Sequence, residues 1–386
     1  MVPTSGHTIG QKTQDRVPPH RTPTPTGISN REALNIVEHQ KRDHGEEKNP
    51  RHDSGLTFVT VVYEPEYTLL KLQARSMRIF LPEGLVHEII VIDNSAWGMS
   101  KDRLSTLRHE YGHLSDRVRI LRPRKICSIP PMVGWRSQQI LKLEVAKLID
   151  RDAYVVLDAK NHLIDTLQRD FILAPDGRLR VNVNNFEDHP FRPSLERVLT
   201  YLCLDPKAYI HCFPVTVTPF TFDTTTVLEM IQGIEDRSGR RFAEEFVLQD
   251  LTEFFLYSGW IISRGRELAE LYDFHQIFCP MIWPKAADPE SCKNALDKAS
   301  RRGIPFLSLH RGALPNLEPK SIDLLARFWV DRNLFSSTED AKHWLAECLR
   351  EIRRHSRIKG LLSGPYRLVT LPWRVKRRLL KWMVVR

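Results

Sequence analysis

The segment YVVLDAKNHLI, residues 154–164, indicates the fold class. Its first four residues are apolar, and the run is followed by Asp158, Lys160 and Asn161. A short apolar run that is rich in β-branched residues and ends at polar residues is typical of a strand buried on both faces, as in a parallel sheet. Ligands of open α/β sheets bind beyond the carboxyl ends of the strands. The polar residues after this strand therefore mark a candidate site.

The residues before this segment alternate between strands and helices. Apolar helical spacing at 66–81 and 136–149 separates β-rich runs, which predict strands at 57–63, 87–96, 117–123 and 153–157. Strands that alternate with helices imply βαβ units. We therefore predict an α/β fold with an open, mostly parallel sheet flanked by helices.

The pattern changes after Asp158. A Pro-Asp-Gly turn predicts a hairpin within 169–184. Helices are expected up to Glu235 and across 241–261, a short strand at 304–312, and terminal helices within 320–352.

Three segments are expected along the chain. Residues 1–54 are rich in Pro, Thr, His and charge and lack apolar periodicity, which predicts a disordered extension. Residues 55–340 form the predicted folded domain, and residues 341–386 a helical, basic tail.

Composition narrows the class of protein. With 41% hydrophobic and 27% charged residues, most of the 386-residue chain is expected to fold. No apolar run reaches the roughly 18 residues that cross a bilayer, and no secretory signal is recognisable at the start. The six cysteines include no CxxC pair, which argues against a zinc site and favours reduced thiols and a cytoplasmic location.

The basic charge is concentrated at one end of the chain. Residues 350–386 carry a net charge of +11, against +10 for the whole chain, so the rest is close to neutral. A basic nucleic-acid groove in the main domain is therefore not expected.

Five short motifs carry a resemblance to a known class of enzyme. In order they are GWRSQQILKL, AYVVLDAKNHLI, VTVTPFTFDT, TEFFLYSGW and LSLHRG. Over roughly residues 56–335 they resemble a bacterial, GT-A-type glycosyltransferase-like family without a settled function. The resemblance implies transfer of a sugar from a nucleotide-sugar donor to a glycan, a lipid-linked or a cell-envelope acceptor, as in polysaccharide biosynthesis.

The same resemblance implies a metal site, with one departure. In GT-A enzymes a DxD cluster after the fourth strand holds Mn²⁺ or Mg²⁺, whereas this chain has Asp158-Ala159-Lys160-Asn161. Asp158 and Asn161, with His310 later in the chain, are the implied ligands. Lys160 can instead place its charge directly on a phosphate, or simply pair with Asp158.

Glu253 is the candidate catalytic base. It follows the Asp158 cluster at the distance that the resemblance implies. Asp250 lies three residues earlier, so both acids would share one helix face and one pKa would rise toward working pH. A solvated acidic helix face is the alternative.

Further donor contacts are expected at strand and helix ends. His162 is predicted to be structural. A surface or core-edge position is the alternative for His310. An ordinary surface position is the alternative for Gln138, Gln139, Lys142 and Arg311. The candidate donor-binding residues, which include Asp158, are Asp93, Gln138, Gln139, Lys142 and Arg311, with Tyr63 and Glu64 as weaker candidates.

Two other functions remain open. The missing second carboxylate favours a catalytically inactive carbohydrate-binding or nucleotide-binding scaffold. A nucleotidyltransferase is disfavoured, because YEPEYTLLK follows the first strand where a glycine-rich, basic phosphate loop would be expected.

The tail has its own predicted partner. In residues 371–386 basic residues alternate with Trp, Leu, Met and Val so that a helix would be amphipathic. We expect this tail to attach the protein to the anionic inner face of the membrane. A solvated tail or a nonspecific RNA-binding tail is the alternative.

Overall fold

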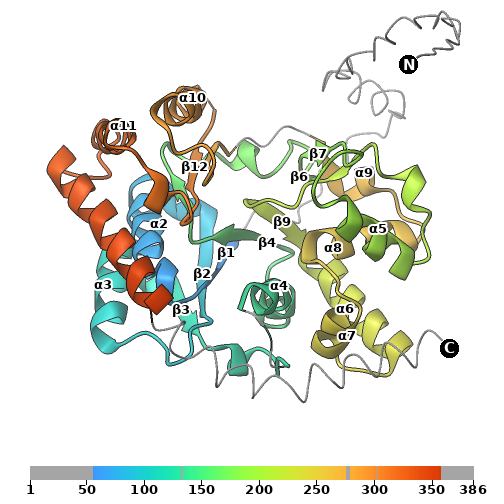
Figure 1. Cartoon of the computed structure of the whole chain (residues 1–386). Helices are drawn as coiled ribbons and strands as arrows, with labels where there is room; N and C mark the ends of the chain where they lie inside the picture. The colour runs from blue at the N-terminus through green and yellow to red at the C-terminus, as the bar shows by residue number, and fades with distance from the viewer. Residues whose placement is uncertain (1–54, 131, 133, 275–278, 302, 358–386) are drawn as a thin grey trace, which may run out of the picture. The chain divides into compact units, whose positions relative to one another are not determined.

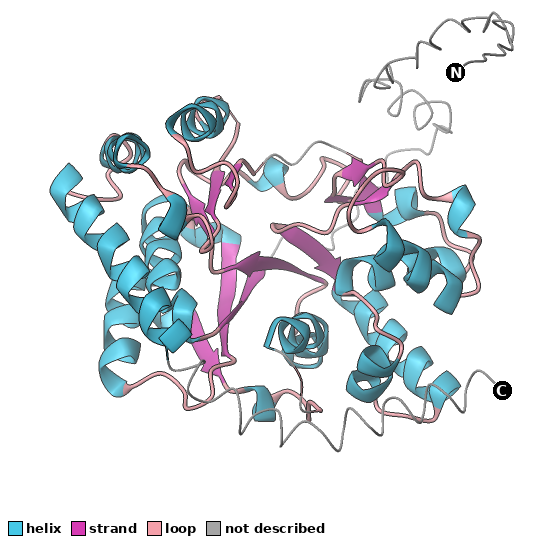
Figure 2. Ribbon diagram, in the orientation of Figure 1, coloured by secondary structure: helices cyan, strands magenta, loops and turns pink. Residues whose placement is uncertain are grey.

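The computed structural model describes residues 55–130, 132, 134–274, 279–301 and 303–357 (Figures 1 and 2). All of them belong to the compact unit Glu46–Arg386. The predictions for residues 1–54 and for the tail beyond residue 357 lie outside the described residues.

A five-stranded sheet forms the centre of the described domain. Its strands lie in the order β3 (Val118–Leu121), β2 (Val86–Asp93), β1 (Leu56–Val62), β4 (Ala153–Asp158) and β9 (Phe220–Asp223). The first four are parallel, and β9 runs antiparallel to β4. The prediction of an α/β fold with a mostly parallel sheet is confirmed.

The register of the sheet aligns three strand ends. Val61 of β1 pairs with Asp158 of β4, and Val62 pairs with Asp93 of β2. The carboxyl ends of β1, β2 and β4 therefore lie at one edge of the sheet, where ligands of open α/β sheets bind.

Helices lie on both sides of the sheet (Figure 1). In that view α2 (Tyr67–Phe80) and α3 (Lys101–Tyr111) lie to the left of β2, and α4 (Gly134–Glu144) lies to the right of β1. β1 is buried along its whole length, as expected for a strand covered on both faces. The helix predicted at 136–149 is α4 followed by a 3₁₀ turn at Val145–Leu148.

The helix predicted at 241–261 is broken in two. α7 (Phe242–Leu248) ends where Asp250 adopts a left-handed conformation (φ 58°), and α8 (Glu253–Ser263) then begins. The N–H of Leu251 donates to the carbonyl of Phe246 and closes α7. Asp tolerates this conformation better than most residues because its short side chain bonds locally.

A three-stranded sheet brings a distant segment next to β4. β12 (Phe306–Leu309) pairs in parallel with β11 (Met281–Ile282) and antiparallel with β5 (Asn161–Leu163). The N–H of Leu309 donates to the carbonyl of Lys160, so the residues after β12 lie beside the polar residues that follow β4.

The hairpin predicted at 169–184 is reduced to its turn. The N–H of Ala174 donates to the carbonyl of Arg178, but only one bridge, Leu173–Leu179, pairs the two arms. The arms pair with other segments instead: β6 (Leu179–Arg180) with β10 (Tyr272–Asp273), and β7 (Val183–Asn184) with β8 (Phe213–Pro214).

The remaining helices cover the ends of the domain. They are α5 (Arg192–Tyr201), α6 (Thr224–Ser238), α9 (Leu268–Leu271), α10 (Pro289–Ala299), α11 (Pro319–Val330) and a helix at 338–357.

The helix at 338–357 packs on the domain. Trp344 is buried against Trp329 with ring centroids 5.4 Å apart, and Glu347 accepts a 2.6 Å ion pair from Lys71 of α2. Residues 341–357 thus pack with the domain, beyond the end at residue 340 that the sequence suggested. Within the described ranges, every helix is too short or too polar to span a bilayer.

Candidate active site

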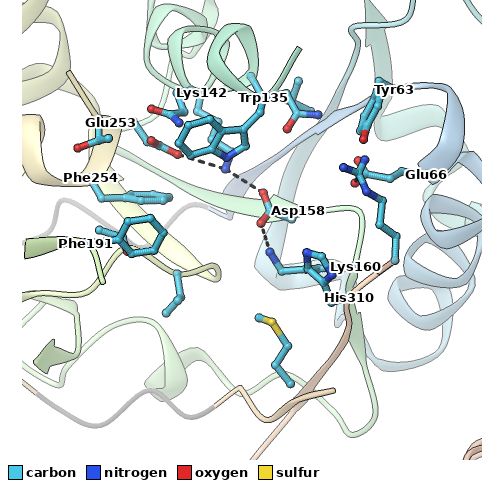
Figure 3. Close-up of a pocket in the computed structure, with 18 of the residues that line it drawn as sticks. Tyr63, Glu66, Trp135, Lys142, Asp158, Lys160, Phe191, Glu253, Phe254 and His310 are labelled. Carbon is cyan, nitrogen blue, oxygen red and sulfur yellow. Dashed lines mark hydrogen bonds and ion pairs between the residues drawn. The ribbon is translucent and has the colours of Figure 1, made fainter. Parts of the chain in front are cut away.

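A pocket of about 350 Å³ opens at the carboxyl ends of β1 and β4 (Figure 3). Its walls are formed by α4, by the start of α8 and by residues at the ends of β1, β4 and β12. The predicted site residues Glu64, Asp93 and Asn161 do not line it; those that do are Tyr63, Gln138, Gln139, Lys142, Asp158, Lys160, Glu253, His310 and Arg311.

Asp158 is held by two ammonium groups at the centre of the pocket (Figure 3). Its Oδ1 lies 2.8 Å from Lys142 Nζ, and its Oδ2 accepts from Lys160 Nζ and, at 3.0 Å, from Thr218 Oγ1. Burial alone would raise the pKa of Asp158, but the two lysines together outweigh it and hold that pKa far below its usual range. Asp158 is therefore a carboxylate at any working pH.

Lys142 connects Asp158 to Glu253. Its side chain is buried, and Nζ lies 3.5 Å from Glu253 Oε1 and 5.3 Å from the ring centroid of Phe254. Burial opposes the charge on Lys142, yet Asp158 and Glu253 raise its pKa. Lys142 is therefore a permanent cation in the pocket wall.

Glu253 is the first residue of α8 and faces the pocket beside Phe254. Burial raises its pKa, and Lys142 opposes part of that shift. The predicted cause was wrong, because Asp250 lies outside α8 and pairs with Arg136 at 3.3 Å and Arg197 at 2.9 Å.

A third carboxyl group, Glu66, lines the opposite wall. Its Oε1 lies 3.3 Å from Arg311 Nη1, and the Arg311 guanidinium lies 4.8 Å from the ring centroid of Tyr63. Burial, and next the charge of Asp158, raise the pKa of Glu66 to about 8. In Figure 3, Asp158 and Lys160 lie between Glu66 on one side and Glu253 on the other.

His310 lies beside Lys160 at the mouth of the pocket (Figure 3). Its Nδ1 accepts from the N–H of Gly312 at 3.0 Å, and its ring stacks on Trp283 at 5.4 Å. Burial and the Lys160 charge lower its pKa, which favours the neutral ring with a proton on Nε2.

The predicted Mn²⁺ or Mg²⁺ site does not fit these residues. Asn161 is fully buried; its Oδ1 accepts from the N–H of Asp158 at 2.7 Å, and its Nδ2 donates to Ser308 Oγ at 2.6 Å. Both oxygens of Asp158 already face ammonium groups. Across the part of the chain that the structure describes, no group of three His, Cys, Asp or Glu side chains is arranged to hold a metal. The assignment of Asp158, Asn161 and His310 as a ligand set is therefore not supported.

Asp93 supports a loop. Its carboxylate accepts from the hydroxyl of Tyr67 at 2.8 Å and the N–H of Met99 at 2.6 Å, and it pairs with Arg122 at 3.0 Å. These donors shape the segment after β2, and Asp93 does not line the pocket around Asp158. It lines a separate pocket with Ala96, Trp97 and Arg122 instead, and its contact with a donor stays a prediction.

His162 lies in the core, as predicted. Its Nε2 accepts from Trp329 Nε1 at 3.0 Å, and burial lowers its pKa to about 3.

Several pocket residues escaped the sequence analysis. Glu66 follows a predicted strand end, which was the one available signal. The others come from separate parts of the chain and include Phe191, Val217, Thr252 and Trp283.

More than half of the chain, residues 58–281, matches a protein family described as a family of unknown function, DUF6492. The chain belongs to the DUF6492 family. No curated protein matches it.

Several solved structures are distantly similar to this DUF6492 protein. Galactosyltransferase LgtC, in complex with donor and acceptor sugar analogs, is 11% identical with a TM-score of 0.42, covering 76% of this chain and 96% of LgtC. The bifunctional glycosyltransferase WbbM is 13% identical with a TM-score of 0.38, covering 67% of this chain and 46%, about half, of WbbM. Glucosyl-3-phosphoglycerate synthase from Mycobacterium tuberculosis, in complex with Mn²⁺, UDP and glucosyl-3-phosphoglycerate, is 12% identical with a TM-score of 0.30, covering 59% of this chain and 88% of that one. These likenesses are too distant to carry an argument about function, which rests on the pocket itself.

Proposed function

We propose that this protein is a glycosyltransferase whose cationic side chains, in place of a divalent metal, hold the diphosphate of a nucleotide-sugar donor. The observation that carries the proposal is the set of three cations, Lys142, Lys160 and Arg311, around one pocket at the carboxyl ends of β1 and β4. A fixed cation beside a leaving diphosphate stabilises the charge that develops there.

The charges of the pocket favour an anionic ligand. With all acids ionised, Glu66, Asp158 and Glu253 balance the three cations. The raised pKa of Glu66, about 8, keeps it mainly protonated at neutral pH, so the cations are then in excess. A diphosphate would complete this balance, and Lys160 and Arg311 are the cations whose side chains are partly exposed to receive it.

The proposed reaction needs one base. The acceptor hydroxyl oxygen forms a bond to the anomeric carbon, the bond from that carbon to the phosphate oxygen breaks, and the nucleoside diphosphate leaves with the electron pair. The hydroxyl proton goes to the carboxylate of Glu253, whose raised pKa brings it closer to the range of an effective base. Lys142 keeps a share of Glu253 ionised through their 3.5 Å contact.

A thermal-shift screen tests the donor class. A ligand that binds the native state stabilises it by RT ln(1 + [L]/Kd), so the shift ranks nucleotide-sugars. We expect one donor class to raise Tm equally in EDTA and in Mn²⁺. A shift that requires Mn²⁺ would contradict the role of the lysines, and no shift with any nucleotide-sugar would contradict the proposed donor.

A catalytically inactive sugar- or nucleotide-binding scaffold is the second candidate. The ion pairs that occupy both oxygens of Asp158 favour it, because they also stabilise a resting pocket. Binding of a nucleotide-sugar without its turnover, in the presence of any acceptor, would support the scaffold. A nucleotidyltransferase gains no support, since Glu64–Glu66, an acidic 3₁₀ turn, follows β1.

A further inference from the structure

Exposed apolar side chains gather around the mouth of the pocket. Among the described residues, Trp135, Phe191, Val217 and Trp283 are large apolar side chains that are 57%, 42%, 41% and 47% exposed, and all four line this pocket. They come from the start of α4, the residue before α5, the loop before β9 and the residue after β11. We call these four residues the apolar rim.

Ring contacts hold two of the rim side chains in place. The Trp283 indole stacks on His310 with an interplanar angle of 28°, and Phe191 packs on His189 with centroids 5.6 Å apart. Figure 3 shows Trp135 beside Lys142 and Phe191 beside Phe254, both on the side of Asp158 where Glu253 lies. The rim therefore presents aromatic faces next to the proposed reaction centre.

Among the buried residues of the same pocket, two carry a polar side-chain atom without a partner. Gln139 Oε1 and Thr252 Oγ1 belong to residues that are 2% and 8% exposed, and neither has a hydrogen-bond partner among the described residues. Buried polar atoms are nearly always paired, so an unpaired one in a pocket wall indicates a polar ligand group. Thr252 directly precedes Glu253, the proposed base.

From these features we infer that the rim binds a carbohydrate acceptor, with a sugar ring stacked on the rim and a hydroxyl beside Thr252 and Glu253. This inference rests on the proposed function and names its acceptor class. A pyranose has a face of C–H groups, which packs on the electron-rich face of an aromatic ring, and an edge of hydroxyl groups. Gln139 Oε1 and Thr252 Oγ1 each have less than 1 Å² exposed, so the hydroxyls can pair with them once these side chains turn toward the ligand. An alkyl chain would leave both atoms unpaired, so the pocket favours a sugar over a lipid tail.

Variants of the rim test the inference. The intact protein is applied to an array of defined oligosaccharides, and the best-bound one is titrated by isothermal calorimetry against wild type, Trp135→Ala and Trp283→Ala. We expect each variant to bind it at least tenfold more weakly, and Trp135→Phe, which keeps an aromatic face, to recover most of the affinity. Trp97→Ala is the matched control, because Trp97 is 94% exposed and lies outside the pocket; it should bind within twofold of wild type.

Other outcomes overturn the inference. It fails if no oligosaccharide binds, or if Trp135→Ala and Trp283→Ala bind as wild type does while their Tm is unchanged. Binding to phosphatidylcholine vesicles that both rim variants lose, without oligosaccharide binding, would assign the rim to a lipid instead.

Donor binding separates this inference from the proposed function. Each protein is also titrated with the nucleotide-sugars of the thermal-shift screen. If oligosaccharide binding depends on the rim but no nucleotide-sugar binds, the carbohydrate site is supported and the proposed transferase function is contradicted. If the rim variants still bind a nucleotide-sugar but no protein binds any oligosaccharide, the proposed donor site stands and the carbohydrate site at the rim is contradicted.

Discussion

Replacing Glu66 with Gln should remove a pH dependence from diphosphate binding. Glu66 lines the pocket opposite Glu253 and pairs with Arg311 at 3.3 Å. Its pKa is raised to about 8 by burial and by Asp158, so the group is mainly neutral at pH 7 and mainly ionised at pH 9. An ionised Glu66 both repels a diphosphate and competes with it for Arg311.

The size of the effect follows from the pKa. If the bound state requires neutral Glu66, the apparent Kd grows as 1 + 10^(pH − pKa), which predicts about tenfold weaker binding at pH 9 than at pH 7. The repulsion between two unit charges about 8 Å apart, at an effective dielectric constant of about 20, is about 2 kcal/mol or about 30-fold. The effect should therefore level off near that limit at higher pH.

Isothermal calorimetry with UDP and with pyrophosphate measures the effect. Glu66→Gln, which copies the neutral acid, should lose the tenfold weakening between pH 7 and pH 9 and keep only the change that comes from titration of the probe. Titration of the probe itself would appear in both proteins and cancels in the comparison. Glu64→Gln is the matched control: it removes the same charge two residues away, outside the pocket, and should keep the wild-type pH dependence. A wild-type Kd that does not change with pH, or an equal change in Glu66→Gln, would refute the reasoning.

Three further predictions concern charge, proton transfer and the tail. Lys160→Ala should weaken UDP binding at least tenfold while EDTA leaves wild-type binding unchanged, as measured by calorimetry; loss in EDTA that Mn²⁺ restores would contradict this. Glu253→Gln should lower kcat by about 10²–10⁴-fold and change donor Kd little, because a base acts in the transition state; equal loss of donor affinity would make Glu253 a donor contact. Deleting residues 365–386, which lie outside the described residues, should release the protein from anionic liposomes at low salt, since each basic residue near the surface contributes about 1 kcal/mol. Sedimentation of the truncated protein with the liposomes to the same extent would rule out the anchor.

The sheet and most of the pocket could be predicted because their signals are local. The apolar run at 153–157, bounded by polar residues, marked β4 and placed Asp158 at its carboxyl end. The residues after β12 were likewise marked by an apolar run that ends in polar residues, and the start of α4 by polar residues in the first turns of an apolar helical pattern. The register then brings these ends together at one edge of the sheet.

The surroundings of Asn161 and Asp93 could not be predicted from the sequence, because long-range partners decide both. Asn161 begins β5 directly after a two-residue turn, and its amide bonds Ser308, which lies 147 residues later. Asp93 collects donors from Tyr67 and Met99, on two different segments. A polar residue at a strand end can face a ligand or a loop, and only the fold decides which.

The break between α7 and α8 also could not be predicted from the sequence. Residues 241–261 have continuous helical spacing, and the left-handed Asp250 leaves no pattern in neighbouring residues. The break moves Glu253 to the start of a helix and leaves burial as the main cause of its raised pKa. The apolar rim could not be predicted either, because its four residues come from separate loops and helix ends that only the tertiary fold brings together.

Release of nucleoside diphosphate tests the central claim most directly. Purified protein is incubated in EDTA with a panel of nucleotide-sugars and mixed oligosaccharide acceptors, beside Asp158→Asn, which removes the carboxylate shared by Lys142 and Lys160. We predict acceptor-dependent release of a nucleoside diphosphate from at least one donor, and loss of that release in Asp158→Asn with the fold retained. No release from any nucleotide-sugar by the wild-type protein, with EDTA or with Mn²⁺, would contradict the assignment as a glycosyltransferase.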